Sequence, residues 1–185
     1  LKPNISSNNI SSDDVIIVSR DIGTHGATIF AAREGMDLES NLQSDCKSLY
    51  PIVKKLIDEN INITALRDAT RGGLSAVLNE WAKQSDICIE VNEEDVPTCD
   101  EVKGICELLG FESFNLANEG TFVLAVKKED AKKTVDILNE FNSNNSANII
   151  GTVTNQYDKK VVLNSPWGTK RFLETPTGEL LPRIC

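Results

Sequence analysis

Residues 65–74 run from the end of an expected strand, through a charged turn, into the start of an expected helix: Ala65-Leu66-Arg67-Asp68-Ala69-Thr70-Arg71-Gly72-Gly73-Leu74. Residues 61–66 alternate as a strand, and the glycine pair opens a helix that we expect to continue to about Gln84 with an apolar stripe. A strand that passes through a charged turn into a helix leaves unpaired N–H groups and the positive end of the helix dipole at that turn. The stretch therefore predicts a place that is receptive to an anion.

The side chains of this turn suit a phosphate. Arg67 and Arg71 can clamp phosphate oxygens in two-pronged fashion, and the two glycines, Gly72 and Gly73, let an anion come close to the backbone. Asp68 can hold a metal-bound phosphate or orient one of the arginines. The spacing is not that of a Walker A loop.

A purely structural interpretation of the same turn is equally open. Thr70 can serve as the N-cap of the helix, and both arginines can form ordinary ion pairs on the surface.

Working outward, strands and helices alternate along the chain and end in short consecutive strands. This order predicts an α+β fold, a mixed sheet flanked by helices. We expect strands at 15–19, 61–66, 87–91, 121–126, 148–153, 160–163 and 169–172, and helices at 25–36, 48–60, 72–84, 100–109 and 128–141.

The expected domain is residues 14–174. Residues 1–13 are rich in Asn, Ser and Asp, which predicts a disordered linker or cut end, and we expect residues 175–185 to be a mobile tail. The first residue is Leu rather than Met, so we expect a piece of a longer protein whose remaining part lies upstream.

Composition excludes several classes of function. The 185 residues carry a net charge of −9 without a basic stripe, so we expect no nucleic-acid partner. No long apolar run or signal segment is present, which favours a cytoplasmic protein with no membrane partner. With one histidine and five cysteines that lack a Cys-x-x-Cys pair, we expect neither a metal site nor a disulfide framework.

Two further segments could carry chemistry. Glu119 lies between Asn118 and Gly120 at the mouth of a strand, where its carboxylate could project into a cleft as a general base, although most such residues are solvated turn residues. His25, between Thr24 and Gly26 at a helix start, could stabilise phosphate, although a lone histidine more often caps or packs.

The tail ends in Pro182-Arg183-Ile184-Cys185. A terminal thiol can thread into a narrow active site and act as a tethered substrate, and Pro182 keeps the segment extended. The Cys185 thiol is not primed and would need a partner enzyme to load it. The alternative is a free cysteine on a frayed end.

Together these motifs resemble the HypE family of hydrogenase expression/formation proteins, in the superfamily of aminoimidazole ribonucleotide synthetase and selenophosphate synthase. The resemblance covers essentially everything from residue 14 onward. The matching segments are residues 21–26, 32–35, 44–46, 65–74, 117–120 and 182–185.

The resemblance implies a fold like the C-terminal domain of aminoimidazole ribonucleotide synthetase, and the activity of a carbamoyl dehydratase in nickel-iron hydrogenase maturation. A carbamoyltransferase partner would load the thiol of Cys185, ATP would phosphorylate the carbonyl oxygen, and loss of phosphate would leave a thiocyanate. The cyanide would then pass to a scaffold complex and to the iron. Catalytic roles fall on Cys185 and Glu119, and a phosphate role falls on Arg67, Asp68, Thr70, Arg71, Gly72, Gly73 and His25.

By the same resemblance, the family's N-terminal half holds most ATP and magnesium ligands and the main homodimer interface, so we expect this chain alone to be inactive. Four positions depart from the family pattern: Arg20-Asp21 replaces Gly-Thr, Thr24 replaces Asp, and Ala69 replaces Pro. Two alternatives stay open, a non-catalytic carrier module that presents Cys185 and another ATP-dependent synthetase of the superfamily.

Overall fold

The computed structural model describes residues 4–36 and 42–175. Within them, a seven-stranded sheet has the order β2-β4-β1-β5-β3-β6-β7, in which β3 and β6 are parallel and every other neighbouring pair is antiparallel. The mixed sheet flanked by helices that the sequence predicted is confirmed. The strands are β1 (Val15–Val18), β2 (Ile63–Asp68), β3 (Cys88–Asn92), β4 (Phe122–Val126), β5 (Asn148–Thr154), β6 (Lys160–Asn164) and β7 (Lys170–Phe172).

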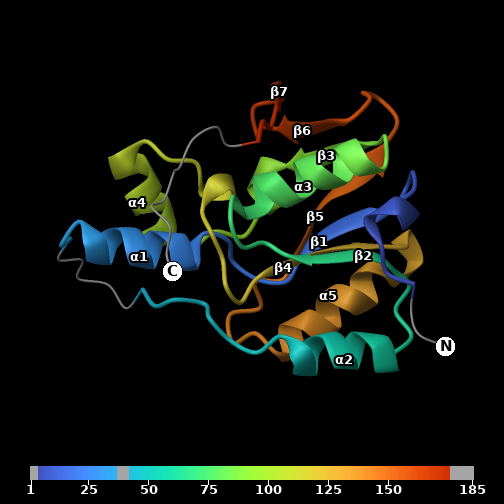
Figure 1. Cartoon of the computed structure of the whole chain (residues 1–185), viewed down its shortest axis with the longest axis horizontal. Coiled ribbons are helices and arrows are strands. Elements are labelled where there is room, and N and C mark those ends of the chain that lie inside the picture. Colours follow the sequence, from blue (N-terminus) through green and yellow to red (C-terminus); the bar gives the residue numbers. More distant parts are fainter. Residues whose placement is uncertain (1–3, 37–41, 176–185) are drawn as a thin grey trace.

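The helices form three groups around this sheet (Figure 1). α3 (Gly73–Gln84) covers one face, and the pair α2 (Tyr50–Asp58) and α5 (Ala131–Glu140) covers the other. α1 (Thr24–Arg33) and α4 (Asp100–Leu109) pack on each other at one end of the sheet. Short 3₁₀ turns occupy Ser7–Asn9, Glu93–Asp95, Ser113–Asn115 and Lys128–Asp130.

β1 shows why the sheet is covered on both faces. Its four residues are all buried; Ile16 and Val18 contribute to the core beneath α3, whereas Val15 and Ile17 contribute to the core beneath α2 and α5. Successive side chains of a strand point to opposite faces, so an unbroken apolar run is what a doubly covered strand requires. This central strand places the residues that follow it, beginning at Ser19, at the end of the sheet where α1 and α4 lie.

The structure corrects the prediction for the N-terminal segment. Residues 4–13 are packed on the domain rather than disordered: Ile10 is buried in the core beneath α3, and the N–H of Ser6 donates to Thr64 O over 3.0 Å. Two isolated isoleucines suffice because an existing sheet supplies the surface that the segment covers, which composition alone cannot reveal. Of the predicted tail, 175–185, all but the first residue, and with it Cys185, lies outside the described residues.

Most predicted elements lie within a few residues of the observed ones. The difference that matters most for the candidate site is at the end of β2. The strand was expected to end at Leu66, but it continues through Arg67 and Asp68 because these residues pair with Val123 and Phe122 of β4. Within the described ranges, no helix has both the length and the apolar character needed to cross a membrane.

Candidate functional site

The side chain of Asn118 joins the three segments that the sequence singled out. Its Oδ1 accepts from the N–H of Gly23 at 2.7 Å, and its Nδ2 donates to Ala69 O at 2.8 Å. Main-chain bonds strengthen the junction, with Gly26 N donating to Ala117 O at 2.9 Å. Asn118 is fully buried, so its amide has no competing water and fixes the turn before α1, the turn after β2 and the turn before β4 together.

Asp45 holds the turn that carries Glu119. This buried carboxylate accepts from Glu119 N at 3.0 Å, from Gly120 N at 2.9 Å and from Thr121 Oγ1 at 2.8 Å. A Cβ at Gly120 would lie 1.8 Å from Asp45 O, so only glycine allows the two chains to approach this closely. The three donors offset the cost of burying this carboxylate, and the hydrogen bonds hold the turn at residues 119–121 in place.

The start of α3 differs from the prediction. Gly72, with φ of 77°, occupies the N-cap position, and no side chain of the described residues caps the helix, so Thr70 is not the N-cap. Gly73 has φ of 61°, and a Cβ there would lie 2.5 Å from the carbonyl oxygens of Phe114 and Leu116. Within this chain, the glycine at 73 therefore admits the protein's own backbone, whereas the sequence assigned that space to an anion.

The charged residues of the predicted phosphate turn are on the surface. Arg67 Nη1 pairs with Glu80 Oε1 of α3 at 2.6 Å, the kind of surface ion pair that the structural interpretation of this turn predicted for both arginines. Asp68 and Arg71 are exposed, and neither forms an ion pair within the described residues. The guanidinium of Arg67 is thus already occupied, while Asp68 and Arg71 keep their charges available.

Glu119 and His25 lie on the rim of the junction. The Glu119 side chain is exposed and forms no hydrogen bond or ion pair with the described part of the chain. His25 Nδ1 lies 2.8 Å from Ser44 Oγ, and Ser44 Oγ also accepts from Cys46 N at 3.2 Å. The structure therefore brings His25, Glu119 and the turn after β2 around one junction, with Glu119 facing solvent.

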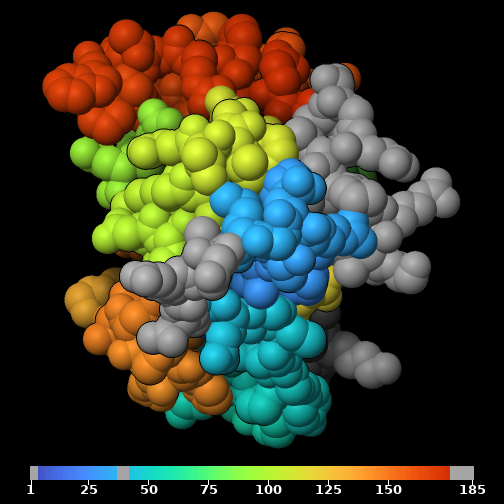
Figure 2. Space-filling view, turned by 90° about the vertical axis from the view of Figure 1, so that its left-hand side faces the viewer, coloured from blue at the N-terminus to red at the C-terminus, as the bar shows by residue number. Residues whose placement is uncertain are grey.

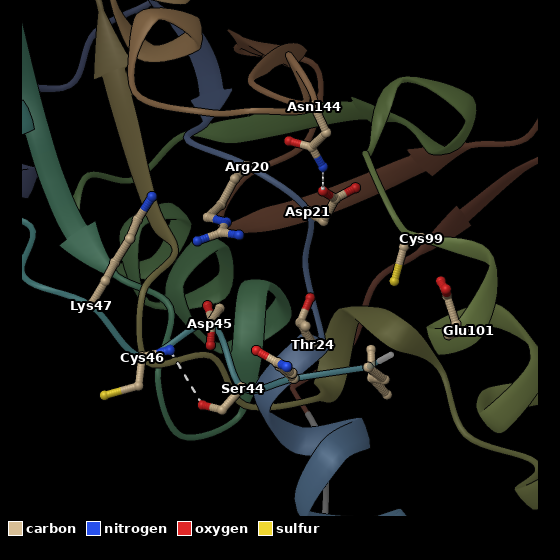
Figure 3. A pocket seen from close by; sticks show the side chains of 12 residues that line it. Arg20, Asp21, Thr24, Ser44, Asp45, Cys46, Lys47, Cys99, Glu101 and Asn144 are labelled. Atoms are coloured by element: carbon tan, nitrogen blue, oxygen red, sulfur yellow. Dashed lines mark hydrogen bonds between the residues drawn. The ribbon is translucent and has the colours of Figure 1, made fainter. Parts of the chain in front are cut away.

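A cleft of about 380 Å³ opens beside this junction, between the end of β1, the start of α1 and residues 42–47 (Figure 3). Figure 2 views this end of the molecule, where α1 in blue lies beside α4 in yellow-green. The residues that line the cleft are Arg20, Asp21, Thr24, Leu42, Gln43, Ser44, Asp45, Cys46, Lys47, Cys99, Glu101 and Asn144.

Two cations of the cleft influence each other. Partial burial and the neighbouring Arg20 guanidinium lower the pKa of Lys47, and the Asp45 carboxylate opposes them. Arg20 Nε is buried and has no hydrogen-bond partner within the described residues. Sequence reasoning missed the roles of Asp45, Asn118, Arg20 and Lys47, although all four lie in or beside the motifs that carried the resemblance.

The internal cysteines are free thiols, with Cys88 and Cys106 buried and Cys46 exposed. Burial raises the pKa of Cys106 to about 11, so this thiol stays protonated at neutral pH. The described residues contain no group of three or more His, Cys, Asp or Glu side chains placed to hold a metal ion.

The fold and the junction define a class of domain: residues 11–164 match the family model described as AIR synthase related protein, C-terminal domain, and the chain belongs to this family. The chain is similar to a protein of Methanocaldococcus jannaschii named as a hydrogenase expression/formation protein, with 42% identity over 177 residues, 96% of this chain and 52% of that protein. It is also 42% identical over 176 residues to the carbamoyl dehydratase HypE of Escherichia coli, covering 95% of this chain and 52% of the relative.

Solved structures agree with this resemblance. A hydrogenase maturation protein HypE in complex with ATP has a TM-score of 0.94 and 34% identity, covering 100% of this chain and 56% of that one. A HypE–HypF complex has a TM-score of 0.88 and 35% identity, covering 94% of this chain and 56% of that one. The resemblance to HypE that the motifs indicated is confirmed, and the chain spans about half the length of the curated relatives it matches.

Proposed function

We propose that the chain is the C-terminal part of a carbamoyl dehydratase that acts in the cytoplasm during nickel-iron hydrogenase maturation. The observation that carries the proposal is the junction around Asn118 and Asp45, which holds Glu119 at the meeting point of the three motif segments. The 42% identity to a carbamoyl dehydratase supports the same reaction class.

In the proposed reaction, Cys185 carries the substrate as a thiocarbamate. The carbonyl oxygen attacks the γ-phosphorus of ATP, an O–P bond forms, and ADP leaves. The C–O bond then breaks with phosphate as the leaving group, and both protons of the nitrogen are lost. The sulfur of the cysteine then carries a nitrile group and is part of a thiocyanate. We assign removal of a nitrogen-bound proton to Glu119, whose exposed carboxylate is free to accept it.

The remaining motif residues fit auxiliary roles. We propose that the exposed Arg71 and the first turn of α3 face the transferred phosphate from one side, and that Asp68 contributes a single carboxylate to a magnesium ion bound with ATP. One carboxylate together with phosphate oxygens and waters is a common environment for magnesium, which would reduce the charge repulsion between phosphates. Most ligands of ATP and magnesium, and the homodimer interface, are assigned to the part of the relatives that this chain does not span.

Two partners follow from this chemistry. A carbamoyltransferase must load Cys185, and the similarity to the HypE–HypF complex supports a loading partner of that kind. A maturation scaffold must then accept the cyanide for delivery to iron.

The experiment replaces Glu119 by glutamine in the full-length protein. Glu119→Gln keeps the shape and removes the proton acceptor, so carbamoylation of Cys185 should persist while thiocyanate formation slows by about 10²- to 10⁴-fold. Mass spectrometry of the intact protein after incubation with carbamoyltransferase, carbamoyl phosphate and ATP distinguishes the two adducts. The matched control is Glu129→Gln, at an exposed glutamate of the 3₁₀ turn before α5.

A carrier module without catalysis is the second candidate, and the solvent-facing position of Glu119 favours it. In that case thiocyanate forms at the normal rate in Glu119→Gln, and the base lies elsewhere. Loss of carbamoylation in this variant would instead show that Glu119 is needed for docking to the loading enzyme.

A further inference from the structure

We propose that Arg20 and Lys47 form a binding site for a phosphate-type oxyanion in the cleft between the end of β1 and residues 42–47. The site is separate from the helix N-terminus that the motif at residues 65–74 suggested. It deepens the proposed function, because an ATP-driven dehydration produces phosphate, but its occupancy can be measured without any turnover.

The first step is the state of the Arg20 guanidinium. Its Nε is buried without an acceptor, and the described residues give Arg20 neither a hydrogen bond nor an ion pair. An unsatisfied buried donor costs free energy, and more so on a charged group. Arg67 provides the comparison, since its guanidinium is bound to Glu80 while that of Arg20 remains available for a ligand.

The second step is the charge beside Arg20. Lys47 extends into the same cleft (Figure 3), and its strongest contact in the described residues is a marginal 3.5 Å bond from Nζ to Asn142 Oδ1. Burial and then the neighbouring Arg20 guanidinium lower the pKa of Lys47, as expected for two cations that line one cleft. A ligand with two negative charges would neutralise both.

The third step is that two of the three carboxylates of the cleft, Asp45 and Asp21, accept hydrogen bonds from other residues, and the third lies away from Lys47. Both carboxylate oxygens of Asp45 accept hydrogen bonds from the turn at residues 119–121, and Asp21 Oδ2 accepts from Asn144 Nδ2 at 2.5 Å. Glu101 lies with Cys99 on the opposite side of the cleft from Lys47 (Figure 3). Arg20 forms no ion pair with any of these three carboxylates.

The start of α1 adds an uncharged hydrogen-bond donor to the cleft. The backbone N–H of Thr24, the first residue of α1, has no acceptor within the described residues, and the N-cap residue Gly23 provides no side-chain cap. Helix N-termini favour anions through such groups. A planar guanidinium, an ammonium and an N–H group around about 380 Å³ match the several oxygens of a phosphate better than the single charge of a carboxylate.

The test is a nuclear magnetic resonance titration of the ¹⁵N-labelled chain with inorganic phosphate at pH 7, with sodium chloride holding the ionic strength constant. We expect saturable shifts of the Thr24 and Lys47 amides. Arg20→Gln and Lys47→Gln should each weaken binding about tenfold or more, which corresponds to about 1.4 kcal/mol. Lys132→Gln is the control, because Lys132 is 87% exposed on α5 and pairs with the exposed Asp136.

Two further experiments identify the source of the phosphate and provide a second variant in case the first does not fold. Tighter binding of ADP or ATP than of inorganic phosphate at the same amides assigns the site to a nucleotide phosphate, and equal binding assigns it to free phosphate. If Arg20→Gln does not fold, Arg20→Lys replaces it and should show weaker binding, because the two-pronged guanidinium is lost.

Three outcomes would overturn the site: no saturation, equal losses in Lys132→Gln, or acetate that shifts the same amides with the same midpoint. None of them bears on the dehydratase proposal, which depends on the chemistry at Cys185 and Glu119.

Discussion

Replacing Asp45 by asparagine should destabilise the chain by about 3 kcal/mol. The carboxylate has three donors, and an asparagine can keep its oxygen toward Gly120 N and Thr121 Oγ1 only by turning its NH₂ toward Glu119 N. One donor then loses its acceptor, at a cost of about 1 kcal/mol at this partly exposed position. The two surviving bonds lose the assistance of the charge, about 1 kcal/mol each.

Urea unfolding measures this loss. Trp81 is buried in α3 and reports global unfolding by fluorescence, whereas Trp167 is 90% exposed. A loss of 3 kcal/mol should lower the melting temperature by about 6–12 °C in a domain of this size. Asp45→Ala should cost more, because all three donors lose their acceptor.

The control for Asp45→Asn is Asp58→Asn, which removes an exposed carboxylate from an i,i+4 pair with Lys54 on α2. That pair should contribute about 0.3–0.5 kcal/mol. A loss below about 1 kcal/mol in Asp45→Asn would refute the reasoning, because the turn at 119–121 would then find its acceptors elsewhere.

Three more predictions concern backbone, charge and ligand. Gly73→Ala should lower the free energy of unfolding, measured in urea, by about 2–5 kcal/mol, because φ is left-handed at 61° and the new Cβ would lie 2.5 Å from two carbonyl oxygens. The control Gly104→Ala in α4, with open space around its Cβ, should be neutral or stabilising, and equal effects of the two variants would contradict this reasoning. Lys47→Met should raise the free energy of unfolding slightly at pH 7, because a lowered pKa means that the charged lysine destabilises the native state. The stability difference between variant and wild type should vanish as the pH rises from the lowered pKa through 10.5, and a variant that is less stable at pH 7 would contradict this prediction. Calorimetry should find that this chain alone binds ATP more weakly than micromolar, since it spans only about half of the relatives, and a micromolar dissociation constant would place the main nucleotide site here.

The fold was predictable because its signals are local. The apolar run of β1 and the amphipathic pattern of α4, whose bounds were predicted at Asp100 and Leu109, depend on residues within one element. The extension of β2 through Arg67 and Asp68 was missed because strand pairing with β4, more than fifty positions away, decides it. The same reason explains why residues 4–13 were expected to be disordered.

The site was predictable only as a set of motifs. Glycines at 72 and 73 indicate a close approach, but the sequence does not say whether a ligand or the chain's own 114–116 segment makes it. Asp45 and Asn118 act through partners 49 to 95 positions away, which no spacing rule connects. Arg20 was noted only as a departure from the family pattern, and its unsatisfied Nε is a property of burial.

This shared junction determines how losses of activity should be interpreted. Asp45 and Asn118 hold the backbone that carries Glu119, so their variants move the candidate base without changing its chemistry. Glu119→Gln does the reverse, since an exposed side chain without partners in the described part of the chain can be exchanged at little cost in stability. A dehydration defect that Glu119→Gln shares with Asp45→Asn, but without the loss of stability, therefore assigns the defect to the carboxylate itself. If dehydration fails only in Asp45→Asn, the junction matters for shape, and the proton acceptor belongs to the part of the protein that this chain does not span.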